Sequence, residues 1–389
     1  MFFSLPVLMY HSICKFKHRL CISPDLFEDQ CRVLAANGWR GIRLSEAEDY
    51  FLRKGKLPKK TLLFTFDDGY LDSYVHAEPI LRRYGHHGAL FPVLDLVERD
   101  GPLRPTREDL GTNPDAAPLI AELDKRPTVF RSRQSVSEIR FCNWNEIRQM
   151  HKHGHMASAP HSLRHDRVIR SLEFKHLYTP GQQRGFFSPP PHAVLWGFPQ
   201  FNLGHFLSDR AYVPVPELFE LVKKMVPQEN KEALAFLRKP VNMQALLKAI
   251  RALPVLGVLE SEQQYRARIF KEFTQCRERF EGELGEAPLS FCWPWGDYSS
   301  MAREEAKRAG FRLFFTTMRG ANVRARAGQV RRMSVRNGTG EELLQRLRVH
   351  SNSLYSEAIF WHNAIYARAW KKREGKKFLF RTFPFLSHK

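Results

Sequence analysis

The sequence TLLFTFDDGYLDSY, residues 61–74, is the most informative stretch of this chain. It begins as an apolar run, which suits a strand buried on both faces of a parallel sheet. The run ends on two adjacent carboxylates, Asp67 and Asp68, and Gly69 then permits a tight turn. Two ionised carboxylates at a buried strand end repel each other and lose hydration, and a divalent cation held by one of them would offset that cost. The alternative interpretation is an ordinary turn that leads into a helix cap.

A histidine pair lies further along, in ASAPHSLRHDRV, residues 157–168. His161 and His165 are four residues apart, a spacing that would place both imidazoles on one side of a helical turn. Two His and one Asp make a three-ligand site in which water takes the remaining position, as in hydrolytic zinc centres. Histidines at this spacing are otherwise usually solvated surface residues, so the interpretation as metal ligands depends on the presence of the two aspartates.

These stretches carry a family resemblance. TFDDG, HSLRH and then FCWPWGDYSS, residues 291–300, resemble in this order the successive motifs of the polysaccharide deacetylases, the NodB-like carbohydrate esterase family 4. The opening PVLMYHSI, residues 6–13, resembles the branch that acts on envelope poly-N-acetylglucosamine. The resemblance covers residues 5–165 and 265–340. It implies an α/β fold, a distorted (β/α) barrel of the NodB type, with the active site at the carboxyl ends of the strands.

The resemblance also implies roles for individual residues. The metal ligands, expected to hold a divalent ion and most suitably zinc, are Asp68, His161 and His165. Asp67 is the expected general base, and the backbone N–H of Trp295 the expected donor to the oxyanion. The expected substrate contacts are Tyr70, Pro294 and Trp295.

The chain departs from the family pattern at two catalytic positions. The Arg that normally precedes the Pro and orients the base is absent, because Cys292 and Trp293 stand before Pro294. Arg332, in a late strand, is the predicted substitute. The usual late Leu-x-His, which carries the general acid, is also missing. His350 lies in a helical context, so His11, at the end of the first strand, is the preferred histidine of the pocket.

Composition limits the cellular setting. The six cysteines (14, 21, 31, 142, 276 and 292) have no CxxC spacing, which favours reduced thiols and a cytoplasmic protein. The opening MFFSLPVLMYHSI has no basic segment before its apolar run, so no cleaved signal peptide is expected. No stretch reaches the length of a membrane span. The net charge of +20 favours anionic partners.

Strands alternating with helices predict an α/β fold with a parallel sheet, and changes in the character of the sequence divide the chain into four parts. Residues 1–179 form the first part of the deacetylase barrel, 180–258 an insertion over the barrel mouth, 259–350 the second part of the barrel, and 351–389 a basic aromatic C-terminal tail. The insertion opens with a Pro-, Gly- and aromatic-rich segment predicted to be irregular. Three short helices follow, at 217–226, 229–237 and 241–253, and a long helix at 261–284 returns to the barrel.

The end of the tail, residues 366–389, mixes eight basic residues with large aromatic side chains. This pattern is typical of interfacial membrane attachment, although single-stranded nucleic acid is an alternative partner for the same residues. The predicted protein is a metal-dependent deacetylase of an N-acetylated amino-sugar glycan, in an envelope polysaccharide or a lipid-linked precursor. It is expected at the anionic cytoplasmic surface of a bacterial inner membrane, with no nucleic-acid partner.

Two alternative functions remain at this point. One is a catalytically weak, sugar-binding relative that keeps the metal but lacks acid catalysis. The other is a basic nucleic-acid-binding protein, which predicts a steep salt dependence of affinity and for which the sequence offers no recognition motif.

Overall fold

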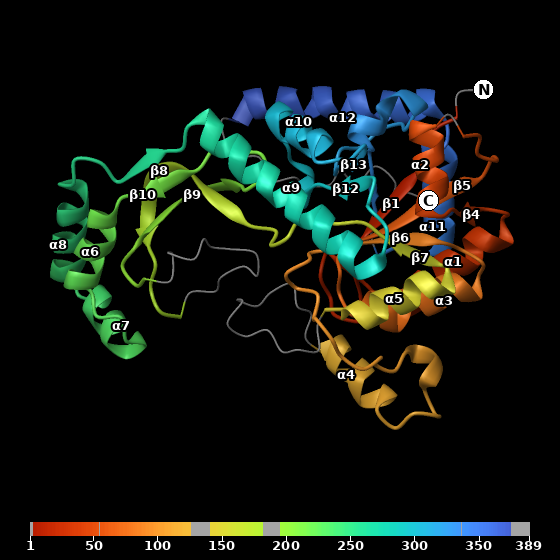
Figure 1. The fold of residues 1–389 in the computed structure, drawn as a ribbon, viewed down its shortest axis with the longest axis horizontal. Coiled ribbons are helices and arrows are strands. Elements are labelled where there is room, and N and C mark those ends of the chain that lie inside the picture. The colour runs from red at the N-terminus through yellow and green to blue at the C-terminus, as the bar shows by residue number, and fades with distance from the viewer. Residues whose placement is uncertain (1–2, 54, 126–140, 182–194, 336, 375–389) are drawn as a thin grey trace.

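The computed structural model describes residues 3–53, 55–125, 141–181, 195–335 and 337–374. A barrel of strands and helices occupies one end of the molecule, and a smaller lobe of strands and three helices occupies the other (Figure 1). The long helix α9 (Glu262–Leu284) runs between them. Among the described residues, none of the helices has both the length and the apolar character that crossing a bilayer requires.

A parallel sheet forms the wall of the barrel. Its strands, in spatial order, are β14 (Met333–Ser334), β1 (Val7–Tyr10), β5 (Thr61–Asp68), β6 (Gly88–Pro92) and β7 (Met156–Ser158), with β4 (Arg40–Gly41) beside the start of β5. All eight residues of β5 are buried, as expected of a strand whose Leu62, Leu63, Phe64 and Phe66 form an apolar run covered on both faces. The small strands β2 (Ser12–Ile13) and β3 (Cys21–Ile22) follow β1.

A second pair of parallel strands, β12 (Ser290–Cys292) and β13 (Leu313–Phe315), completes the ring. The Cys292 N–H donates to the carbonyl of Pro160, just after β7, at 3.1 Å. On the other side Phe315 bridges to Val330, which precedes β14. The predicted fold class, a distorted (β/α) barrel, is therefore confirmed.

Helices cover the outside of this ring, and the sequence signals at their ends are found in the structure. The Ser23 hydroxyl accepts from the Leu26 N–H at the start of α1, and α9 ends at Gly285, whose φ is +77°. The remaining barrel helices are α2 (Leu44–Leu52), α3 (Glu78–Arg83), α5 (Trp144–His153), α10 (Ser300–Arg308) and α11 (Gly340–His350), besides α1 (Pro24–Ala36). The short helix α4 (Ala116–Lys125) lies to one side, and α12 (Ser353–Glu374) runs along the outside.

Aromatic side chains fill the core between the sheet and α1. Tyr10 stacks on Phe66 with ring centroids 5.4 Å apart, and Phe27 packs edge-on against both. All three side chains are almost fully buried. This packing holds β1 and β5 in register, so that their carboxyl ends, which carry His11 and the two aspartates, meet at the same edge of the sheet.

The lobe is more regular than predicted. Its first feature is an antiparallel pair, β8 (Arg167–Leu177) and β9 (Pro199–His205), so the expectation of irregular structure is wrong for residues 199–205. Pro199 and Phe201 are buried on either side of the less buried Gln200, but the buried Gly204 breaks this two-residue period, so the strand signal is weak in the sequence. Residues 182–194 lie outside the described part of the chain.

The helices of the lobe are confirmed. They are α6 (Pro216–Met225), α7 (Asn230–Arg238) and α8 (Pro240–Arg251), and β10 (Tyr212–Pro214) pairs with β11 (Gly257–Leu259) at the base of the lobe. Their apolar faces form a separate small core around Phe198 and Leu218. Since β8 begins at Arg167, strand structure of the lobe starts before residue 180; the boundaries of the four parts themselves stay predictions.

Candidate metal centre and active site

The carboxyl end of β5 is a conformationally unusual turn. Asp68 has a φ of +74° and Gly69 a φ of +82°. A Cβ atom at position 69 would lie 2.8 Å from the Cβ of Pro92, so only glycine fits. Left-handed backbone conformations are costly for other residues and cluster at functional sites. Ser162, His165 and Trp295 share this conformation; His165 lies beside Asp68, and Ser162 and Trp295 both contact His165.

The predicted metal ligands converge. One ligand atom from each of Asp68, His161 and His165 lies within 4.8 Å of the other two, and all three residues are buried. The Nε2 atoms of His161 and His165 are 3.7 and 3.8 Å from the same Asp68 oxygen. His161 Nδ1 donates to the Cys292 carbonyl at 2.9 Å, which leaves the lone pair on Nε2 directed at the cluster.

The two histidines are not on a helical turn, so that part of the prediction is wrong. They lie in a loop after β7, in which Ser162 and His165 adopt left-handed conformations. The Ser162 hydroxyl accepts from the His165 N–H at 2.9 Å and closes the loop. The loop thus brings both imidazoles together, as a helix would have done at the same spacing.

The electrostatics of the cluster suit a cation. Burial lowers the pKa of His161 to about 4 and also lowers the pKa of His165 well below its usual value, so both rings are neutral and able to ligate. Burial and then the charge of Asp67 raise the pKa of Asp68 to about 7. One carboxylate oxygen with two imidazole nitrogens is a donor set that fits zinc, so the residues present fit the predicted ion.

Asp67 has a different environment from its neighbour. The Arg332 guanidinium donates to its two oxygens at 2.6 and 2.9 Å, and Arg332 also donates to the Thr316 carbonyl at 2.8 Å. Burial, the largest single effect, raises the pKa of Asp67, but the charge and hydrogen bonds of Arg332 together with the nearby His161 and His11 outweigh it and bring the pKa down to about 2. The structure therefore places Arg332 beside the predicted base, where the sequence lacks the family's arginine before Pro294.

His11 lies on the open side of the same carboxylate. Its Nε2 is 3.8 Å from an Asp67 oxygen, its side chain is 18% exposed, and burial lowers its pKa. His350 is elsewhere, at the end of α11 against Ser356. Tyr70 lies deeper than a substrate contact would, because it is 2% exposed and stacks on Phe141; its role in substrate binding stays a prediction.

The lobe contributes residues to the site that sequence reasoning missed. The Trp295 ring centroid lies 4.0 Å from that of His165. His205, at the end of β9, stacks on Trp295 at 4.4 Å with an interplanar angle of 11°, and its Nδ1 is 2.7 Å from an Asp297 oxygen. Arg167, opposite His205 in the β8–β9 register, lies over the same ring at 4.9 Å. Nothing in the sequence indicated that Arg167 and His205 meet Trp295, since residues 199–205 were predicted to be irregular and no strand pair was expected there.

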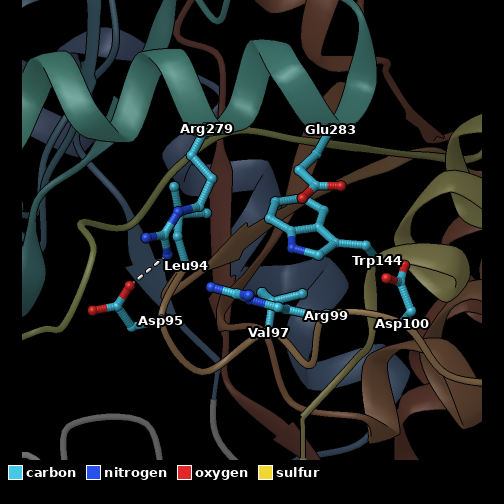
Figure 2. A pocket seen from close by; sticks show the side chains of 8 residues that line it. All are labelled: Leu94, Asp95, Val97, Arg99, Asp100, Trp144, Arg279 and Glu283. Atoms are coloured by element: carbon cyan, nitrogen blue, oxygen red, sulfur yellow. Dashed lines mark hydrogen bonds and ion pairs between the residues drawn. The ribbon is translucent and has the colours of Figure 1, made fainter.

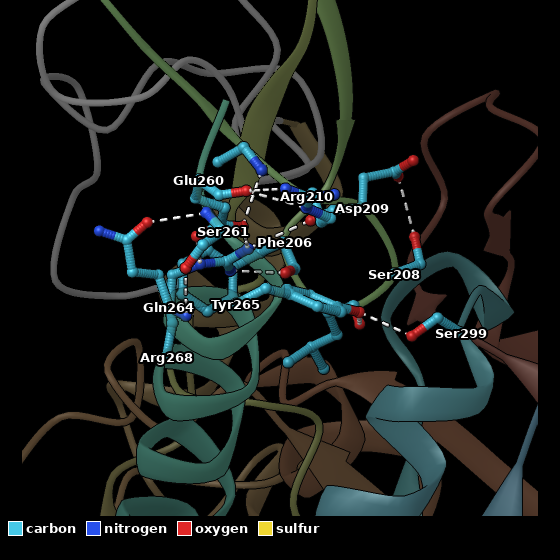
Figure 3. A network of polar contacts seen from close by, with 12 residues as sticks. Phe206, Ser208, Asp209, Arg210, Glu260, Ser261, Gln264, Tyr265, Arg268 and Ser299 are labelled. Carbon is cyan, nitrogen blue, oxygen red and sulfur yellow. Dashed lines mark hydrogen bonds and ion pairs between the residues drawn. The ribbon is translucent and has the colours of Figure 1, made fainter. Parts of the chain in front are cut away.

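A polar network fixes the end of β9 to α9 (Figure 3). Arg268 forms an ion pair with Glu260 at 2.6 Å and donates to the Phe206 carbonyl at 2.7 Å. The Tyr265 hydroxyl is 2.7 Å from both the Leu207 carbonyl and the Ser299 hydroxyl. These contacts hold the residues after His205 against the barrel, so the stack on Trp295 has a rigid support.

An open pocket of about 450 Å³ borders the histidine loop from the other side (Figure 2). Its lining residues are Leu94, Asp95, Val97, Arg99, Asp100, Trp144, Arg279 and Glu283. Asp95 forms an ion pair with Arg279, and its N–H donates to the Leu163 carbonyl at 2.7 Å. None of the predicted site residues lines this pocket.

Comparison with known proteins identifies the family. Residues 54–184 match the polysaccharide deacetylase family model, and this range includes both aspartates and both histidines. Residues 54–184 therefore belong to the polysaccharide deacetylase family. YxkH of Bacillus subtilis, a protein assigned to the polysaccharide deacetylases, is 37% identical over 89 residues, which are 23% of this chain and 32% of YxkH. The match thus spans about a third of that relative.

Solved structures of deacetylases share the fold. A de-N-acetylase from Aggregatibacter actinomycetemcomitans is similar with a TM-score of 0.54 and 17% identity, covering 88% of this chain and 98% of that one. The BpsB deacetylase domain from Bordetella bronchiseptica is similar with a TM-score of 0.53 and 19% identity, covering 86% and 96%. At these identities the likeness establishes the fold, which is the NodB-type barrel. Trp295 and Arg332 lie outside the family-model match.

Proposed function

We propose that the chain is a metal-dependent N-deacetylase, which hydrolyses the acetamide of an amino sugar in a bacterial envelope polysaccharide or a lipid-linked glycan precursor. The observation that carries this proposal is the pairing of Asp67 with Arg332 directly beside the cluster of Asp68, His161 and His165. It supplies an ionised carboxylate that is not one of the three proposed ligands and lies next to them. The reactions named for the similar structures, de-N-acetylation and deacetylation, support the reaction class.

The chain supplies the ligands and the base. Asp68, His161 and His165 would hold a divalent cation, most suitably zinc, which when bound lowers the pKa of water and polarises a carbonyl. Asp67 accepts the proton of the attacking water, since it is ionised and lies next to the ligand set. Arg332 holds both oxygens of Asp67 and so fixes the direction of its lone pairs.

Two further groups act on the substrate in this proposal. The backbone N–H of Trp295, presented by a left-handed residue whose ring contacts His165, stabilises the oxyanion that develops on the acetamide carbonyl. His11, partly exposed and 3.8 Å from Asp67, takes over the proton that Asp67 accepts from water and passes it to the departing amine. Pro294 and Trp295 border the small cavity that His205 and Asp297 also line, and would contact the sugar.

We further propose that the protein works at the anionic cytoplasmic surface of the inner membrane. All six cysteines are free thiols and buried, which fits a reducing compartment. On α12 the exposed apolar side chains are Leu354, Tyr355, Ile359, Trp361 and Ile365. Basic residues at 368 and 371–373 continue the same helix, and this combination favours attachment to anionic lipid. Residues 375–389 of the predicted tail lie outside the described part of the chain.

The test of the proposed reaction is acetate release by the full chain loaded with zinc. N-acetylglucosamine oligomers are the first substrates, and glycolipids from a strain that lacks the protein are analysed by mass spectrometry. We expect acetate release in vitro and, in the strain, one additional acetyl group on a particular glycan. Bound zinc without acetate release from any acetamido sugar would instead favour the catalytically weak, sugar-binding relative.

A further inference from the structure

Arg167 is an unusual cation at the mouth of the site. Its guanidinium lies over the Trp295 ring, which also contacts the proposed metal ligand His165. Its Nε is buried and has no hydrogen-bond partner, and among the described residues no carboxylate pairs with the guanidinium. A buried donor without a hydrogen-bond partner costs free energy unless a ligand accepts its hydrogen bond.

The neighbouring charges on the same strand and loop are paired. Arg164 binds Asp166 at 2.8 Å, and Arg170 lies 3.7 Å from Asp209. His205 lies 2.7 Å from Asp297. Asp166, Asp209 and Asp297 are therefore engaged with other partners. Glu272, which also lines the small cavity, accepts from the Leu163 N–H at 2.8 Å, and none of these four carboxylates pairs with Arg167. Burial lowers the pKa of Arg167, and no nearby carboxylate opposes that effect.

The position of Arg167 is held by structure on both sides. It stands opposite His205 in the antiparallel register of β8 and β9, and His205 stacks on the same Trp295 ring. The network around Arg268 and Glu260 anchors the chain just after His205 to α9 (Figure 3). The guanidinium is thus presented beside the metal ligands by a braced strand pair. A planar, permanently charged group in such a place is suited to bind an oxyanion with two hydrogen bonds.

We propose that Arg167 binds an anionic group of the substrate, a phosphate or a carboxylate, beside Trp295 while the acetamide reaches the metal ligands. This inference rests on the proposed deacetylase function and narrows its substrate class to charged acetamido sugars. The anion lies away from the reacting carbonyl, so Arg167 contributes binding that is equal in the ground state and the transition state. Arg167 is then a determinant of specificity and takes no part in bond making.

The experiment compares binding of three sugars to the zinc-loaded full chain by titration calorimetry: N-acetylglucosamine, N-acetylglucosamine 1-phosphate and N-acetylmuramic acid. We expect the charged sugars to bind about tenfold more tightly than the neutral one, as charge-assisted hydrogen bonds typically provide. Arg167→Gln should abolish that preference and leave the neutral sugar's Kd within about twofold, and Arg167→Lys should keep part of it. The larger preference, for phosphate or for carboxylate, identifies the anion.

The matched control is Arg170→Gln, which removes the same charge from an exposed position on β8 and should keep the preference. Any attraction of the anions to zinc is the same in all variants. The difference in affinity for charged sugars between the wild-type protein and Arg167→Gln therefore reports the contribution of Arg167 alone. With a substrate that is turned over, that variant should raise KM for the charged form at constant kcat. The inference would be overturned if the wild-type protein bound charged and neutral sugars with equal affinity. It would also be overturned if Arg167→Gln weakened the binding of neutral and charged sugars equally. The titrations are repeated in the Asp67→Asn background, which lacks the proposed base, so that no acetate is released and failure of deacetylation is a separate result.

Discussion

Arg332 and Asp67 are 265 positions apart in the sequence, yet two hydrogen bonds of 2.6 and 2.9 Å join them in the buried interior of the barrel. They reach one another because β14 and β5 lie on either side of β1, and the long Arg332 side chain extends from the start of β14 past Thr65, to which it donates at 3.2 Å, to the end of β5. A buried charge pair of this kind depends on both members, since either one alone would be an uncompensated charge. The pair therefore contributes to the stability of the fold, and it also keeps the proposed base Asp67 ionised and in position.

Removal of Arg332 should destabilise the protein strongly. Arg332→Met leaves the Asp67 charge buried and unpaired, and we expect a loss of about 3–5 kcal/mol in the free energy of unfolding. Urea denaturation measures it. Arg326→Met, which breaks a partly exposed pair with Glu357, is the control and should cost less than about 1 kcal/mol. In the double variant with Asp67→Asn, the loss should be smaller than the sum of the single losses; strict additivity would show that the two side chains do not depend on each other.

Replacement of His161 should remove both metal and activity. His161→Ala takes one ligand from a three-residue set, and the remaining two would hold zinc too weakly for it to survive purification. Zinc content by mass spectrometry and acetate release are the measurements. His176→Ala, an exposed histidine on β8, is the matched control and should keep both. Full zinc occupancy in His161→Ala would refute the ligand assignment.

Replacement of Asp67 should separate the base from the ligands. Asp67→Asn keeps the shape but cannot accept a proton, so kcat should fall by about 10²–10⁴-fold while zinc remains bound. Zinc analysis and steady-state kinetics on the same preparation distinguish the two effects. If Asp67→Asn loses its zinc and Asp68→Asn keeps it, the roles of the two carboxylates are reversed.

His76 should make the fold sensitive to acid. It is 2% exposed, neither ring nitrogen has a hydrogen-bond partner, and burial lowers its pKa to about 3. The unfolded chain, with an ordinary histidine pKa near 6.5, binds more protons between these values, so stability is present above pH 6.5 and is lost as the pH falls. From pH 7.5 to pH 5 this group should remove about 2 kcal/mol. His76→Leu should reduce the measured loss of unfolding free energy by that amount, and an unchanged loss would contradict the assignment.

Membrane attachment should depend on the end of the chain. A chain that ends before Tyr366 lacks the eight basic residues of the tail, each worth roughly 1 kcal/mol close to an anionic surface. We expect the full chain to float with phosphatidylserine liposomes and the shortened chain to remain in the dense fraction. Trp361→Ser with Ile365→Ser tests the apolar contribution of α12 and should weaken flotation of the full chain. Equal flotation of the full and shortened chains would remove the support for this placement.

The sequence by itself indicated the barrel and the four side chains at its centre. The reason is that β5 and the histidine loop are local features: a buried strand ending in Asp67 and Asp68, and two histidines four positions apart, leave their signal in short stretches. The caps of α1 and α9 are local in the same sense, since Ser23 and Gly285 act on residues next to them. The loop conformation of His161 and His165 was missed because helical and left-handed turns can place residues four apart on one side.

Only the tertiary structure decided which distant side chains meet these residues. Arg332 reaches Asp67 across the sheet, and His205 and Arg167 reach Trp295 from a strand pair in the lobe. No spacing in the sequence encodes such contacts, because they depend on strand order, on register and on how the lobe packs against α9. The apolar period of a strand indicates which of its faces is buried. The partner of a buried charge depends instead on the order and register of the strands. That is why the clustering of Asp68, His161 and His165 could be predicted and Arg332 could be named as a candidate, whereas the approach of Arg167 and His205 to Trp295 could not.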